Sequence, residues 1–92
     1  MAKRVDKNHR EIVHAFQKMG ASTFSLHELG KGVPDLCVGH QGITHLVEIK
    51  GRTGHLNAMQ QDWHHRWGGR PVAVIRSIDD AHALLQEAHD RD

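Results

Sequence analysis

Residues 34–50, PDLCVGHQGITHLVEIK, contain two apolar segments on either side of a short polar stretch with two glycines. We predict a strand over Pro34–Val38, a hairpin turn over Gly39–Gly42 and a second strand over Thr44–Lys50. Pro34 cannot donate a hydrogen bond to a neighbouring strand, so it belongs at the first position of its own strand. The stretch therefore predicts a β-hairpin.

The segments around this hairpin show helical or strand patterns in turn. Ahead of it, apolar residues at helical spacing predict a helix over Asp6–Met19, and Thr23–Leu26 alternates like a short strand. Behind it, we predict a helix over Asn57–Trp67, a strand over Val72–Ile75 and a last helix capped by Ser77. This order predicts an α/β fold with a mixed four-stranded sheet flanked by helices. The first three strands form a meander, and the fourth pairs in parallel through a right-handed crossover.

Several expectations concern which residues are buried. In the helix over Asn57–Trp67, the spacing of Met59, Trp63 and Trp67 favours packing against the core over stacking on nucleobases. The unbroken apolar run Val72–Ile75 is typical of a strand buried on both faces. The lone cysteine, Cys37, is expected to be a small buried apolar residue. The ten histidines show no zinc-binding spacing, so we expect most of them at the surface.

The composition limits the possible classes of protein. The chain has 92 residues, which predicts one domain over residues 1–92, and its net charge is +1. Binding to DNA would therefore depend on local basic patches. The N-terminus lacks the apolar segment of a signal peptide, and no stretch reaches membrane-spanning length, so we expect a cytoplasmic protein. A domain of this size buries only roughly 60–65% of its surface, which favours a homo-oligomer.

The residues that carry chemistry are Asp35 and, after twelve intervening residues, Glu48-Ile49-Lys50. Glu48 and Lys50 share one face of the strand, about 6–7 Å apart, and the hairpin can bring Asp35 beside them. Two acids can hold Mg²⁺ with a phosphate, and an amine can orient water or offset charge on the phosphate. The alternative is an exposed Glu–Lys pair with a turn aspartate, and Glu-x-Lys alone favours that alternative.

The ordered set of motifs resembles the PD-(D/E)XK nuclease superfamily and, within it, the stand-alone phage and bacterial form of the virus-type replication–repair nuclease domain, VRR-NUC. The resemblance covers about Val5 to Leu84. The matching stretches are Glu11–Val13, Gly30–Leu36, Glu48–Gly51, Leu56–Gln60 and Trp63-His64. This resemblance implies a restriction-endonuclease-like αβββαβα fold.

The resemblance also implies a role for each residue of the central motif. Asp35 and Glu48 match the acids that bind the metal, with Mg²⁺ or Mn²⁺ as the expected ion. Ile49 matches the position whose backbone carbonyl joins the coordination sphere. Lys50 matches the catalytic lysine.

Two further residues match positions near the active site of the family. Glu11 matches an acid of the first helix that supports the metal or its waters, although it could be an ordinary exposed glutamate. Asp6 competes for that role, but its place at the start of the helix suits a cap. Gln60 matches a glutamine that opens the next helix. It also lies three residues after Asn57, as in a capping box, and the two roles are compatible.

The resemblance implies a structure-selective DNA endonuclease without an organic cofactor, active in DNA repair in a bacterial or phage-infected cell. A four-way (Holliday) junction resolvase acting as a homodimer is one form of this expectation. Lys31, Arg52 and Arg10 are candidate contacts to DNA. The alternatives are a non-catalytic DNA-binding module with the same fold, a protein-interaction subunit, and a histidine-based metal enzyme that uses His64.

Overall fold

A computed structural model of the protein describes residues 7–90. Its four strands are arranged in the order β1-β2-β3-β4. They are β1 (Ser22–Ser25), β2 (Leu36–His40), β3 (Ile43–Ile49) and β4 (Ala73–Ile75). The first three strands pair antiparallel, and β4 pairs in parallel with β3. The expected mixed sheet, with a three-stranded meander and a parallel fourth strand, is therefore confirmed.

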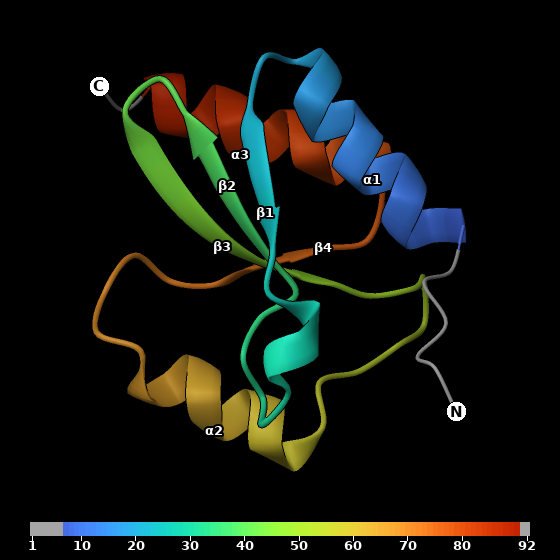
Figure 1. Ribbon diagram of the computed structural model, residues 1–92, viewed down its shortest axis with the longest axis vertical. Helices are drawn as coiled ribbons and strands as arrows, with labels where there is room; N and C mark the ends of the chain where they lie inside the picture. The colour runs from blue at the N-terminus through green and yellow to red at the C-terminus, as the bar shows by residue number, and fades with distance from the viewer. Residues whose placement is uncertain (1–6, 91–92) are drawn as a thin grey trace.

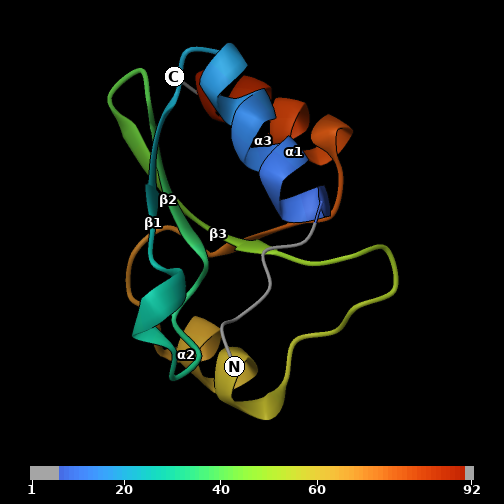
Figure 2. The ribbon, with the colours of Figure 1, turned by 45° about the vertical axis from the view of Figure 1, so that its right-hand side comes forward.

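Three helices accompany the sheet, α1 (Lys7–Lys18), α2 (Ala58–Arg66) and α3 (Ile78–Asp90), together with a short 3₁₀ helix, η1 (His27–Leu29). Helices α1 and α3 lie side by side over one face of the sheet, whereas α2 lies apart from them near the opposite end of the molecule (Figures 1 and 2). The α/β class and the order of the elements agree with the prediction. No helix within residues 7–90 has the length and apolar character needed to cross a membrane.

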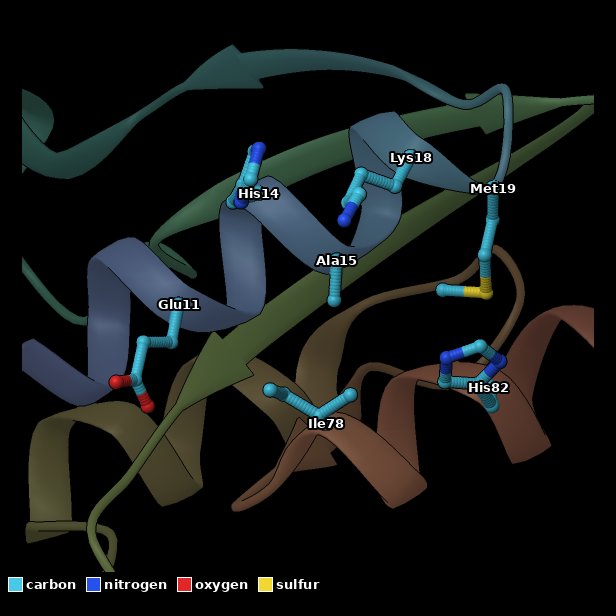
Figure 3. Close-up of a pocket in the computed structure, with 7 residues that line it drawn as sticks. All are labelled: Glu11, His14, Ala15, Lys18, Met19, Ile78 and His82. Carbon is cyan, nitrogen blue, oxygen red and sulfur yellow. The ribbon is translucent and has the colours of Figure 1, made fainter.

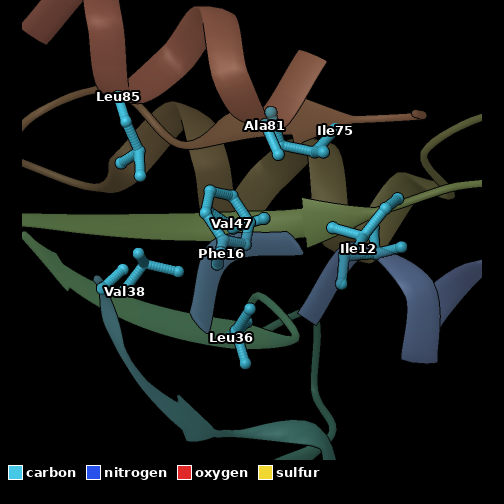
Figure 4. Packing of buried hydrophobic residues seen from close by; sticks show 10 residues of the cluster. Ile12, Phe16, Leu36, Val38, Val47, Ile75, Ala81 and Leu85 are labelled. Atoms are coloured by element: carbon cyan, nitrogen blue, oxygen red, sulfur yellow. The ribbon is translucent and has the colours of Figure 1, made fainter. Parts of the chain in front are cut away.

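The hydrophobic core fills the space between the sheet and the pair α1 and α3 (Figure 4). The residues labelled in Figure 4 are Ile12, Phe16, Leu36, Val38, Val47, Ile75, Ala81 and Leu85. The apolar faces of α1 and α3 supply much of this core, because their buried residues recur at the spacing that places them on one side of a helix. The hydrophobic core therefore covers one face of the sheet, and functional side chains project from the other face.

Helix α2 does not contribute to this core, so the prediction for Met59, Trp63 and Trp67 is wrong. None of the α2 residues is buried. Met59 is 57% exposed and Trp67 is 43% exposed. The helix turns Gln60 and His64 toward β3, and the two tryptophans stack on each other instead of packing under the sheet.

Two other expectations about burial need correction, for Val72–Ile75 and for Cys37, and one histidine is an exception to the expected surface positions. Strand β4 is an edge strand, and only Ile75 is buried, because β4 has a neighbour on one side alone. His45 is 2% exposed on β3, and burial, followed by the positive charge of Arg70, lowers its pKa. Cys37 is only half-buried because it lies on the sheet face that α1 and α3 do not cover.

The hairpin and its entry also differ from the predicted bounds. Strand β2 begins at Leu36, after the buried Pro34, and the turn narrows to Gln41 and Gly42. The loop before β2 packs against the first turn of α2: a Cβ atom at Gly32 would lie 2.5 Å from the carbonyl oxygen of Met59. Gly32 also has φ +82, which favours glycine. This close approach fixes the segment that leads into Asp35.

Candidate active site

The β2–β3 hairpin brings Asp35 and Glu48 together. In its register Leu36 lies opposite Val47, and one step further along the antiparallel pair Asp35 lies opposite Glu48. The Asp35 carboxylate accepts a hydrogen bond of 2.9 Å from the backbone N–H of Ile49. On the other side, the Asp35 carbonyl oxygen accepts a hydrogen bond of 2.8 Å from the Leu26 N–H. Asp35 is therefore held between β1 and β3.

Glu48 is a buried acid with an incomplete set of partners. Its side chain is 2% exposed, and its Oε1 atom has no hydrogen-bond partner. Burial raises the pKa of Glu48 to about 8, and the hydrogen bond and the charge of the neighbouring Asp35 carboxyl act in the same direction, while Lys50 opposes them. Burying the charged form of Glu48 in this way costs free energy, unless a cation compensates the negative charge.

Lys50 and Gln60 join β3 to the first turn of α2. The Lys50 Nζ donates a hydrogen bond of 3.0 Å to Gln60 Oε1 and lies 3.9 Å from Glu48 Oε2. Gln60 Nε2 donates a hydrogen bond of 3.3 Å to Glu48 Oε2. Gln60 also forms the predicted capping box with Asn57, since each backbone N–H donates to the other side chain. The capping box thus fixes the side chain of Gln60, which contacts both Lys50 and Glu48.

Two histidines complete this arrangement: His64, which the sequence placed in a matching stretch and in the histidine-based alternative, and His27, which the sequence did not indicate. His27 Nδ1 lies 3.4 Å from Asp35 Oδ1, and His64 Nε2 lies 3.8 Å from Glu48 Oε1. Burial, followed by the charge of Lys50, lowers the pKa of His64. The spacing of His64 four residues after Gln60 places both on one face of α2, and this signal could have identified it. His27 gives no local signal, because η1 only meets Asp35 in the folded sheet.

Glu11, in contrast, does not contact this group. Its carboxylate lies 3.8 Å from Lys7 Nζ, and it lines a pocket between α1 and α3 (Figure 3). The α1 residue that reaches the site strand is Asn8, whose side-chain amide donates a hydrogen bond of 3.1 Å to the Lys50 carbonyl. Asp6, the competing acid, lies outside the described residues.

The three candidate DNA contacts are all exposed. Lys31 lies in the loop before β2 with a positive φ of 56°, and Arg52 lies in the turn that follows β3. Arg10 lies on α1. They come from three separate segments of the chain rather than from one continuous basic stretch.

The acid pair has the donor chemistry that suits a divalent cation. Within residues 7–90 there is no group of three or more histidine, cysteine, aspartate or glutamate side chains placed to hold an ion. Mg²⁺, however, is commonly held by one or two carboxylates together with water and phosphate oxygens. The unpartnered Glu48 Oε1 beside Asp35 fits such a ligand set, and a cation there would remove the cost of burying two acids together.

A comparison with solved structures agrees with this geometry. A solved VRR_NUC domain superposes on the chain with a TM-score of 0.71 and 27% sequence identity, over 89% of this chain and 97% of the other. The chain has the fold of a VRR_NUC domain. No protein-family model matches the sequence, and neither does any curated protein. The resemblance read from the motifs is confirmed, and the VRR_NUC likeness identifies a nuclease-type fold.

Proposed function

We propose that this VRR_NUC-like domain is a Mg²⁺- or Mn²⁺-dependent endonuclease that hydrolyses phosphodiester bonds in DNA. The observation that carries the proposal is the meeting of Asp35 and Glu48 across the hairpin, with an unpartnered buried oxygen and the Lys50 amine beside them. A cluster of acids with a perturbed pKa next to an amine is typical of a catalytic site.

Each residue has a distinct part in this proposal. Asp35 and Glu48 would hold the cation, with the backbone carbonyl of Ile49 as a further ligand. When bound, the cation polarises the phosphate and makes a water molecule nucleophilic at neutral pH. Lys50 orients that water or offsets the charge that develops on the phosphate. From α1, Glu11 would act only through water molecules near the site, because its carboxylate pairs with Lys7 and does not contact the two acids.

Gln60 is proposed as the residue that sets the position of Lys50. Its Oε1 accepts a hydrogen bond from the Lys50 ammonium, and its Nε2 donates to Glu48. The capping box holds the Gln60 side chain at the first turn of α2 before any substrate is present. An amine that is already oriented loses little freedom when the phosphate arrives, which favours catalysis.

We further propose that the enzyme selects DNA by structure, with a four-way junction as the favoured substrate, in a bacterial or phage-infected cell. The described residues form one sheet with three helices, so phosphate contacts from Lys31, Arg52 and Arg10 would position the DNA. A homodimer would present two sites to two strands. Phe24 is 69% exposed and Leu29 is 61% exposed next to the edge strand β1, which supports this as the surface for the second copy.

A panel of DNA substrates tests the proposal. We expect the purified protein to cut a four-way junction or a flap with Mg²⁺ or Mn²⁺, and cleavage to stop on addition of EDTA. Single-stranded and blunt duplex DNA of the same length are the comparison substrates, and Asp35→Asn is the inactive control. Tight binding of the junction without cleavage under either ion would instead favour a non-catalytic DNA-binding module.

A further inference from the structure

The two tryptophans of the chain form a stacked pair at the end of α2, in which Trp63 is half-buried and Trp67 is exposed. The rings of Trp63 and Trp67 lie 5.1 Å apart between centroids, with an angle of 15° between their planes. Trp67 is 43% exposed. Together with Arg66, the pair lines a surface cavity of about 270 Å³. The pair therefore offers flat aromatic surface and a guanidinium to a ligand in the same place.

The fold itself does not explain this pair. Neither tryptophan belongs to the hydrophobic core, and α2 has no buried residue. The turn that follows is shaped to accommodate the indole: a Cβ atom at Gly69 would lie 2.9 Å from Trp67 Nε1. A glycine at this point lets the backbone support the ring without covering it by a side chain. Exposed aromatic surface that is held in place in this way is typical of a binding site.

The position of the pair relates it to the candidate active site. Gln60, His64 and Trp67 recur at the spacing that places residues along one side of a helix. The first two approach Glu48 through contacts of 3.3 and 3.8 Å. Seven residues of helix correspond to a rise of about 10 Å between Gln60 and Trp67. The stacked pair therefore continues from the acids along the same helix.

The chemistry of the pair suits an unpaired nucleobase. Stacking on aromatic side chains accepts every base, because each base has a flat π face, whereas bases inside a duplex are already covered by their neighbours. Arg66 supplies positive charge next to the rings, although it is also paired with Asp62 at 2.9 Å. A DNA strand whose bases stay stacked advances about 3.4 Å per nucleotide, so the 10 Å between Gln60 and Trp67 spans up to about three nucleotides.

We propose that Trp63 and Trp67 form a stacking platform for an unpaired nucleobase about three nucleotides from the phosphate that faces Glu48. This proposal rests on the proposed function, since it names the kind of DNA that the nuclease accepts. A substrate with unpaired nucleotides next to the cleavage point, such as a flap or an opened junction, can contact the acid pair and the tryptophan pair at the same time. A continuous duplex satisfies only the phosphate contacts.

Binding measurements in EDTA test the platform without any cleavage. Flap DNA carries the fluorescent base 2-aminopurine at successive unpaired positions, and blunt duplex of equal length is the comparison. We expect quenching at one position, near the third nucleotide, and a loss of flap affinity on the order of ten-fold in Trp67→Ala. Affinity for blunt duplex is expected to stay unchanged. Trp67→Phe, which keeps an aromatic ring, is expected to retain most of the flap affinity and of the quenching.

A matched control is available on the same helix. Met59 is also apolar and exposed, and Met59→Ala is expected to bind flap DNA like the wild type. Circular dichroism compares the folding of the variants, and sedimentation compares their oligomeric state. Equal flap affinity in Trp67→Ala and the wild type would overturn the proposal. A loss of affinity in Trp67→Ala that is equal for flap and duplex DNA would also overturn it, and so would a variant whose only change is its oligomeric state. A protein that stacks the base but cuts no DNA with Mg²⁺ or Mn²⁺ would refute the nuclease proposal and leave the platform standing.

Discussion

Lys50→Ala is expected to slow DNA cleavage on the order of 1000-fold without a large change in folding. The Lys50 side chain is only 19% exposed, and its amine is oriented by Gln60 Oε1 and lies 3.9 Å from Glu48 Oε2. An amine that is held next to the reacting phosphate stabilises charge more strongly in the transition state than in the bound substrate. Its removal should therefore lower kcat more than it weakens binding. Single-turnover cleavage of junction DNA measures the effect.

A matched control and a binding assay separate the possible causes. Lys18→Ala removes the same charge at the exposed end of α1, and it should leave the cleavage rate close to that of the wild type. Junction affinity in EDTA should change only a few-fold in Lys50→Ala, because one phosphate contact is a small part of the total. A Lys50→Ala enzyme that cuts as fast as the wild type would remove the lysine from the mechanism.

Glu48→Gln is expected to stabilise the metal-free protein above neutral pH. The pKa of Glu48 is raised from 4.5 to about 8, so between these two values the folded state holds a proton that the unfolded state has released. The free energy of unfolding therefore falls as the pH rises through this window, on the order of a few kcal/mol in total. Glutamine has the same shape and no charge to bury, so the variant should lose this pH dependence. Thermal melts of the wild type and of Glu48→Gln in EDTA at pH 5, 7 and 8.5 measure this difference in pH dependence.

In Glu48→Gln, the melting temperature should also no longer rise when a divalent cation is added. A cation that binds only the folded state raises the melting temperature of the wild type, and Glu48→Gln lacks one of the two charged ligands. Because the cation displaces the proton of Glu48, the rise in the wild type should become larger as the pH increases toward 8. Glu28→Gln, at an exposed glutamate, is the control. An identical pH profile for Glu48→Gln and the wild type in EDTA would contradict the assignment of the buried acid.

The parts of the site that the sequence predicted depend on short-range rules. Strand alternation placed Glu48 and Lys50 on one face, and the length of the hairpin predicted that Asp35 would meet them. The capping box followed from the three-residue spacing of Asn57 and Gln60, and the structure forms it with hydrogen bonds of 2.9 and 2.8 Å. Each of these features is decided by residues that are close in sequence or joined by a tight turn.

The parts that the sequence missed depend on where whole elements are placed. Helical spacing shows that Trp63 and Trp67 share a face, but it does not show whether that face meets the core. The burial of His45 and the approach of His27 to Asp35 arise only when β1 and β2 pair and the helices cover the sheet. On α1, no motif indicated Asn8, whose side-chain amide donates a hydrogen bond to the Lys50 carbonyl.

The central claim is that Asp35 and Glu48 hold one divalent cation between them. Crystals soaked in Mn²⁺ locate the ion directly, because its anomalous scattering distinguishes it from water. We predict one peak within roughly 2.0–2.3 Å of an oxygen of each carboxyl group. Mn²⁺ found only at histidine side chains, with no peak between the two carboxyl groups, would contradict the account.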